Sequence, residues 1–219
     1  MSMADKSLYL QDTVHLLNKQ WPDNRTVNIV CHGHSVPAGY FATPMVDTFH
    51  AYPHLLHRGL KERFPFAVIN VIVTAIGGED SESGAARFEQ DVLNHNPDII
   101  TIDYGLNDRR IGLQRAYVAW SSMVEQALSH GCKVILLTPT LDVHEYSASR
   151  DKADGELEGH ARQIRLLARE HQVGLADALS SFRRYADGAD VIDLMSWVNH
   201  PNRSGHELVA AELLRWFPF

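Results

Sequence analysis

The sequence has few cysteines, no long apolar segment and no excess of positive charge. Its two cysteines, Cys31 and Cys132, each border an apolar run, so we expect buried free thiols rather than a disulfide. No stretch approaches the roughly 20 apolar residues that a transmembrane helix needs. The N-terminal "MSMADKSLYLQ" lacks a basic segment followed by an apolar core. We therefore expect no secretory signal, no membrane association and a cytoplasmic location.

The net charge of −7, without a basic run, argues against nucleic acid or an anionic membrane as the main partner. Small or neutral substrates fit this charge better. The chain has 219 residues, of which 45% are apolar, and this length suits one domain over residues 1–219. The sequence does not indicate an oligomeric state.

Five apolar runs have the length and composition of β-strands. They are continuous rather than alternating, which is typical of parallel strands covered on both faces. Helical stripes of apolar residues lie between them, so the order of elements predicts an α/β fold. We expect a three-layer α/β/α sandwich around a five-stranded, doubly wound parallel sheet, as in flavodoxin-like folds. The expected strands are Thr26–Cys31, Ala67–Val73, Asp98–Gly105, Lys133–Pro139 and Val173–Ala178.

Polar or glycine-rich clusters follow the first four of these strands. In an open parallel sheet, functional residues gather just beyond the carboxyl ends of the strands. The opposite ends carry only plain turns such as "HNPD" and "SHGCK". Solvation alone does not explain this asymmetry, because both edges are equally wet. The clusters are "HGHS", "TAIGGED", "YGLNDRR" and "TPTLDVHEY".

Ser35 follows the first expected strand. Gly33 permits a sharp exit from the strand, and the turn that follows would point backbone N–H groups at an anion. The spacing differs from the G-x-S-x-G elbow of α/β-hydrolases, because the next glycine is Gly39. From the local sequence, Ser35 is either a nucleophile or a serine that caps a turn.

Candidate hydrogen-bond donors and acceptors follow the second and third strands. Gly77 and Gly78 supply a backbone that can approach a ligand closely, although paired glycines are also common in turns. The carboxamide of Asn107 can donate to an oxyanion, and Asp108 can order its loop by accepting backbone N–H groups. The alternative for Asn107 is an Asx turn.

Two histidines flank the start of the last expected helix. Pro201 disfavours helix at His200, so this imidazole should project from a loop. His206 lies three residues before Val209 and four before Ala210, on the apolar face of that helix, and we interpret it as structural.

Taken in order, the four clusters resemble the SGNH subfamily of the GDSL esterases and lipases, over almost the whole chain. The matching blocks are "GHS" (33–35), "AIGGEDSESGAARF" (75–88), "GLND" (105–108) and "HPNRSGH" (200–206). The resemblance implies a serine ester hydrolase in which Ser35 is the nucleophile and His200 the general base. It implies an oxyanion hole formed by Ser35 N–H, Gly78 N–H and the Asn107 side chain, and neither a metal nor another cofactor.

Two positions depart from the family pattern. His34 stands where the family usually has aspartate, and Trp197 stands three residues before His200, where the triad aspartate normally lies. A base of this kind works best when an acceptor binds its Nδ1–H. We expect a backbone carbonyl near Trp197 to be that acceptor, with Asp193 as the alternative, so that the enzyme works as a dyad.

Other functions remain open from the residues alone. "HGH" (32–34) with Asp108, Asp142 or His144 could bind a metal ion. A binding module for a carbohydrate or other small ligand, weakly active or silent, would use the same site. For an esterase, short-chain acyl esters, including O-acetylated carbohydrates, are the expected substrates, with acyl thioesters and lysophospholipids as alternatives. Four aromatic residues either stack on a substrate or belong to the core: Tyr40, Phe41, Tyr104 and Tyr146.

Overall fold

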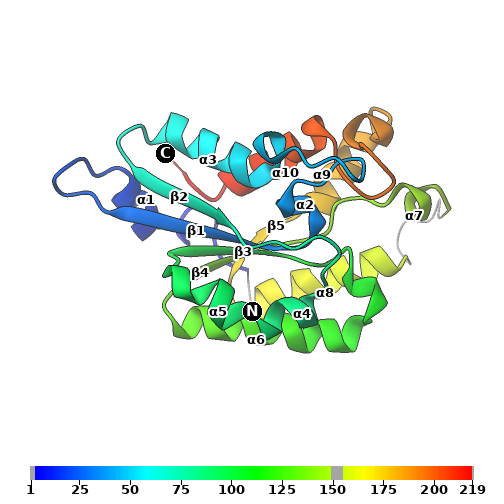
Figure 1. The fold of residues 1–219 in the computed structure, drawn as a ribbon, viewed down its shortest axis with the longest axis horizontal. Coiled ribbons are helices and arrows are strands. Elements are labelled where there is room, and N and C mark those ends of the chain that lie inside the picture. Colours follow the sequence, from blue (N-terminus) through cyan, green and yellow to red (C-terminus); the bar gives the residue numbers. More distant parts are fainter. Residues whose placement is uncertain (1–2, 149–154, 219) are drawn as a thin grey trace.

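A five-stranded sheet lies at the centre of the computed structural model, which describes residues 3–148 and 155–218 (Figure 1). The strand order is β2-β1-β3-β4-β5, and all neighbours pair in parallel. The predicted fold class and all five predicted strands are therefore confirmed. The bounds are β1 (Thr26–Gly33), β2 (Val68–Val73), β3 (Ile99–Asp103), β4 (Lys133–Leu137) and β5 (Gly174–Ala176).

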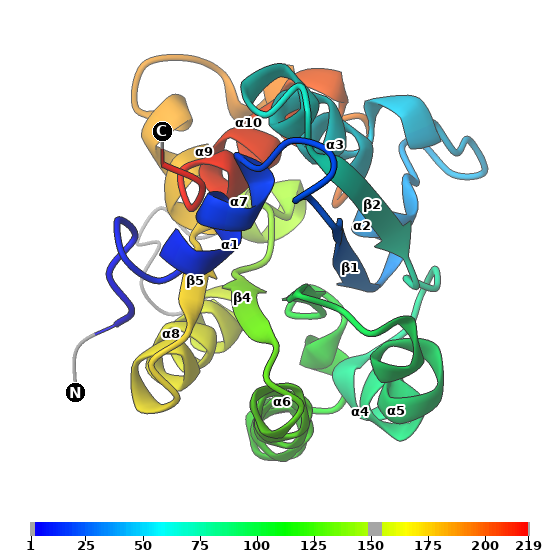
Figure 2. The same ribbon diagram turned by 90° about the vertical axis from the view of Figure 1, so that its left-hand side faces the viewer.

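Helices cover both faces of the sheet (Figures 1 and 2). One layer contains α3, α9 and α10, and the other contains α4, α5, α6 and α8 (Figure 1). The helices are α1 (Gln11–Leu17), α2 (Ser35–Ala38), α3 (Tyr52–Arg63), α4 (Ser81–Ala86), α5 (Phe88–Asp91), α6 (Leu113–Ser129), α7 (Val143–Ala148), α8 (Glu156–Glu170), α9 (Ala178–Ala186) and α10 (Arg203–Leu214). Among the described helices, none is both long and apolar enough to cross a bilayer.

The expectation that every strand is covered on both faces is wrong for β2. Strands β3 and β5 are buried throughout, whereas Val68 is 47% exposed and Val73 41% exposed. The reason is the position of β2 at the edge of the sheet, where it pairs only with β1. The two cysteines are free and buried, as the sequence predicts.

The sheet order reverses between β1 and β3, and the chain is tightly packed there. A Cβ atom on Gly33 would lie 2.4 Å from the carbonyl oxygen of Asp103, so only glycine allows this approach. The next residue, His34, donates its backbone N–H to the same carbonyl at 3.2 Å. The carboxyl ends of β1 and β3 are thus the place at which doubly wound folds bind their ligands.

Candidate active site

Ser35 is the first residue of α2 and directly follows β1 and His34. The imidazole of His34 caps this short helix by accepting the Val36 N–H at Nδ1, at 3.2 Å. Ser35 is buried, and its own N–H points out of the first helical turn without an intrahelical acceptor. The sequence-based expectation of a serine at a strand-to-helix turn is confirmed.

His200 lies in a closed loop before α10. Met195 and Pro201 form an antiparallel bridge, and Ser196 donates from its N–H and its hydroxyl to the His200 carbonyl, at 2.9 and 3.2 Å. These bonds fix the backbone, and the imidazole projects from the loop as Pro201 predicts. Its Nε2 lies 2.8 Å from the Ser35 Oγ. The fold thus joins two residues that are 165 positions apart in the sequence.

The surroundings of His200 keep its imidazole neutral. Burial, with a smaller contribution from the neighbouring imidazole of His34, lowers the pKa of His200 to about 4. A neutral ring whose Nε2 accepts the Ser35 proton carries its own proton on Nδ1. His200 is therefore in the protonation state that a general base needs at neutral pH.

The expected partner for Nδ1 of His200 is not in place. This buried atom has no hydrogen-bond partner among the described residues, so neither the carbonyl of Trp197 nor the carboxylate of Asp193 accepts its proton. The loop closes through the backbone carbonyl of His200, and the Trp197 side chain turns outward, 62% exposed. Asp193 is exposed in a 3₁₀ turn, Val191–Leu194, before the loop begins. The prediction of a carbonyl acceptor at Trp197 is corrected accordingly.

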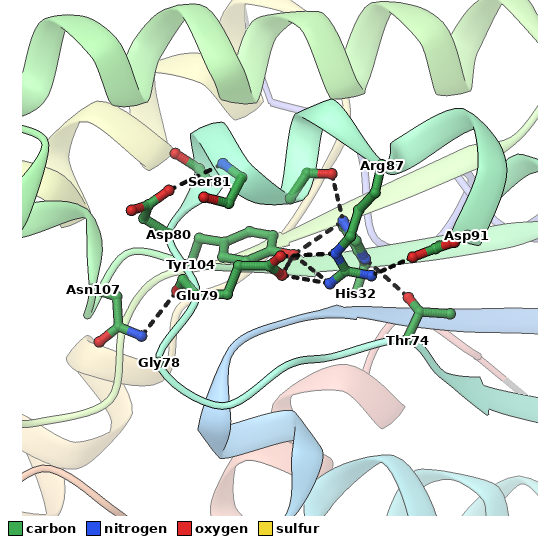
Figure 3. Close-up of polar contacts among 12 residues, drawn as sticks. His32, Thr74, Gly78, Glu79, Asp80, Ser81, Arg87, Asp91, Tyr104 and Asn107 are labelled. Atoms are coloured by element: carbon green, nitrogen blue, oxygen red, sulfur yellow. Dashed lines mark hydrogen bonds and ion pairs between the residues drawn. The ribbon is translucent and has the colours of Figure 1, made fainter.

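Gly78 and Asn107 lie close together on neighbouring loops (Figure 3). Gly78 has a φ of +78°, and a Cβ atom there would meet nothing within 4 Å, so the backbone conformation rather than space favours glycine. Within the described residues, no hydrogen bond occupies the Gly78 N–H. Asn107 donates one carboxamide N–H to the Glu79 carbonyl at 2.9 Å, which leaves its second N–H free to donate.

A largely buried polar network anchors the Gly78 loop through Glu79, and nothing in the sequence pattern predicted it (Figure 3). Arg87 of the α4–α5 junction binds the Glu79 carboxylate through Nε at 2.8 Å and also through its Nη2. The Tyr104 hydroxyl donates to the same carboxylate at 2.9 Å and lies 3.0 Å from His32 Nε2. Burial raises the pKa of Tyr104 far above its usual value, so the phenol remains a donor.

Asp108 connects the block at 105–108 to the block at 75–88. Its Oδ1 accepts the Ser81 N–H at 2.8 Å, and its Oδ2 accepts the Trp120 indole N–H at 2.7 Å. Burial raises the pKa of Asp108 to about 6 despite these bonds. Asp108 accepts a backbone N–H as expected, but the donor is Ser81 at the start of α4 rather than a residue of its own loop.

The remaining histidines of the motifs have structural contacts. His206 is buried in α10, where its Nδ1 accepts the Tyr52 N–H at 3.1 Å, as the structural interpretation requires. His32 joins the network that anchors the Gly78 loop, and its Nδ1 lies 2.9 Å from the Thr74 hydroxyl. Within residues 3–148 and 155–218, no three His, Cys, Asp or Glu side chains are grouped as a metal site requires. Of the four aromatic candidates, Phe41 and Tyr104 belong to the core.

We expect Asn107→Ala to lower kcat by about 10²–10³ with a smaller change in KM, the magnitude that follows loss of one oxyanion donor. The free N–H of the carboxamide would act on charge that develops only in the transition state. Steady-state kinetics on a soluble acetyl ester measures both constants. Asn94→Ala is the matched control, because Asn94 is exposed at the opposite edge of the sheet. A change confined to KM would move Asn107 from catalysis to substrate positioning.

Comparison with solved structures shows the same fold in an acetylxylan esterase and in a second hydrolase. An acetylxylan esterase, Axe2 of Geobacillus stearothermophilus, matches with a TM-score of 0.76 and 21% identity over 88% of this chain and 94% of that one. LAE5, described as an alpha/beta hydrolase enzyme from the metagenome of Lake Arreo, Spain, matches with a TM-score of 0.74 and 22% identity over 87% and 94% of the two chains. Catalytic mutants of Axe2 replace one histidine or an aspartate three positions before it.

The sequence comparisons give a partial relative and a family. An uncharacterized lipoprotein of Bacillus subtilis (strain 168), YqeF, is 31% identical over 78 residues, so this chain spans about 32% of the length of that curated relative. The GDSL-like Lipase/Acylhydrolase family model matches residues 31–208, from the end of β1 to the middle of α10. This match includes Ser35, Gly78, Asn107 and His200, and the chain therefore belongs to the GDSL-like lipase/acylhydrolase family, a family of carboxylic ester hydrolases.

Proposed function

We propose that the protein hydrolyses short-chain acyl esters, with O-acetylated carbohydrates as the leading substrate class, through an acyl-enzyme on Ser35. The observation that carries the proposal is the 2.8 Å contact between Ser35 Oγ and His200 Nε2 at the carboxyl edge of the sheet. A buried serine beside a neutral imidazole is the arrangement that nucleophilic acyl transfer requires.

The reaction proceeds in two steps, acylation of Ser35 and hydrolysis of the acyl-enzyme. His200 Nε2 takes the Ser35 proton as Oγ bonds to the ester carbonyl carbon, and the carbonyl oxygen becomes negative. The N–H groups of Ser35 and Gly78 and the free N–H of Asn107 would donate to that oxygen. His200 then gives its proton to the departing alcohol. A water attacks the acyl-enzyme by the same route, which releases the acid and restores the serine.

The preference for acetyl groups is supported by the structural likeness to an acetylxylan esterase. The test is a panel of acetyl, butyryl and octanoyl esters, an acetylated xylooligosaccharide and an acyl thioester. We expect kcat/KM to be highest for acetyl esters and to fall as the acyl chain lengthens. A maximum for octanoyl or thioester substrates would instead assign lipid or thioester hydrolysis to the same Ser35 and His200.

The orphaned Nδ1 of His200 favours one second function, a carbohydrate-binding module with weak or no activity. Without an acceptor, the imidazolium formed during attack is less stabilised than in a full triad. Calorimetric titration of the same oligosaccharide against the Ser35→Ala variant measures binding without turnover. Tight binding to this variant, together with wild-type hydrolysis too slow to measure, would identify the binding module.

A further inference from the structure

Two buried polar side chains behind Ser35 have no part in the reaction described above. His34 and Asp103 are 1% and 3% exposed, and they come from the ends of the neighbouring strands β1 and β3. His34 Nε2 lies 3.4 Å from Asp103 Oδ1, within ion-pair distance although without hydrogen-bond alignment. The other carboxylate oxygen of Asp103 accepts from the Tyr52 hydroxyl at 3.3 Å. The buried carboxylate of Asp103 thus lies next to His34, the residue that precedes Ser35.

The hydrogen bonds of His34 determine where its proton lies. Nδ1 accepts the Val36 N–H, so this nitrogen carries no proton, and a neutral ring must hold its proton on Nε2. That nitrogen faces Asp103, and a carboxylate favours a proton at this position. If the proton were on Nδ1 instead, the Nδ1–H of His34 would face the Val36 N–H, and α2 would lose its cap.

The tautomer also affects Ser35 directly, because His34 Nδ1 lies 3.3 Å from the Ser35 Oγ. A proton on Nδ1 would be donated to this oxygen and would occupy a lone pair needed for attack. With Nδ1 already bonded to Val36 N–H, the Ser35 proton is directed to His200, whose Nε2 is closer at 2.8 Å.

We propose that Asp103 and His34 are positioning residues for Ser35, an inference that rests on the proposed function. Asp103 holds His34 in the tautomer that caps α2 and leaves the Ser35 proton to His200. The cap on α2 and the buried negative charge are thus divided between two side chains, His34 and Asp103. The site therefore accommodates one buried carboxylate, at position 34 or at position 103.

A double-mutant cycle tests this exchange. We expect Asp103→Asn to lower kcat by about tenfold to a hundredfold, by analogy with the loss of a partner that orients a metal-binding histidine. The kcat of His34→Asp should be lower still, because two buried carboxylates would then lie side by side. Combining both substitutions leaves a single buried carboxylate, at position 34. The double variant should therefore be more active than His34→Asp and at least as active as Asp103→Asn.

The measured quantity is kcat per active site, with sites counted by stoichiometric fluorophosphonate labelling of Ser35, and KM and the melting temperature are recorded in parallel. A merely structural role would change the melting temperature and the number of active sites but not kcat per site. Wild-type kcat per site in Asp103→Asn overturns the inference, as does a double variant no better than His34→Asp. If His34→Asp does not fold, a double variant that is folded and active supports the inference, and one that also fails to fold overturns it.

The outcomes for the inference and for the proposed function are distinct. A wild-type protein that neither labels nor hydrolyses any ester of the panel would overturn both. A wild type that does both, with a cycle in which the two substitutions simply multiply their effects, would overturn only the roles of His34 and Asp103.

Discussion

Replacing Ser35 with alanine is expected to abolish ester hydrolysis while leaving the fold intact. The substitution removes one oxygen at the start of α2, and the cap on the Val36 N–H comes from His34 rather than from Ser35. Hydrolysis of a generic acetyl ester and labelling by a fluorophosphonate probe should both disappear, while the melting temperature changes by only a few degrees. Mass spectrometry of the labelled wild type should place the probe on Ser35.

Ser83→Ala is the control for this variant, because Ser83 is exposed on α4 and uses only its backbone N–H, which donates to Asp80. It should hydrolyse and label like the wild type. Full activity in Ser35→Ala would refute the serine-hydrolase function outright. Labelling of a different residue in the wild type would leave an esterase with another nucleophile.

His200→Ala is expected to be almost as inactive as Ser35→Ala, with a loss of roughly 10⁴-fold or more in kcat. The imidazole is the group in contact with the Ser35 Oγ, and no other described side chain lies as close to that oxygen. Asp193→Asn, in contrast, should stay within about twofold of the wild type, because the Asp193 side chain is exposed outside the His200 loop. Steady-state kinetics on one acetyl ester compares both variants.

His95→Ala serves as the matched histidine control, since His95 is exposed just before β3 at the opposite edge of the sheet. It should retain wild-type kcat. Should Asp193→Asn cost on the order of 10⁴-fold, the effect of neutralising a triad aspartate, Asp193 must swing into the loop during turnover. The prediction that Ser35 and His200 work as a dyad would then be wrong.

The sequence predicted the strands, and it predicted that the site forms at their carboxyl ends, because both follow from local patterns. Continuous apolar runs indicate buried strands, and the polar clusters containing Ser35 and Asn107 come where those runs end. The sequence did not predict the exposure of β2, because local patterns do not show the order of the strands in the sheet. The composition of Val68–Val73 resembles that of a central strand, and only the order of the strands places it at the edge.

The contacts within the site were harder to predict, because they join distant segments of the chain. The pairing of His34 with Asp103 depends on the register between β1 and β3. The Nδ1 of His200 was expected to bind a carbonyl near Trp197, but the loop uses the His200 carbonyl for its own closure. A three-residue offset specifies how far apart two residues lie along the chain, not which way a loop turns its side chains.

The contacts that anchor the Gly78 loop do not involve its exposed side chain at position 76. The loop is attached through the Ile76 N–H to the Gly33 carbonyl, at 3.0 Å, and through the Glu79 carboxylate to Arg87. Neither attachment uses the Ile76 side chain, which is 49% exposed. Position 76 can therefore drift in evolution, or be randomised in a library, without releasing the donors that the loop presents. The exposed side chain at position 76 and the anchored backbone that carries it are thus independent of each other.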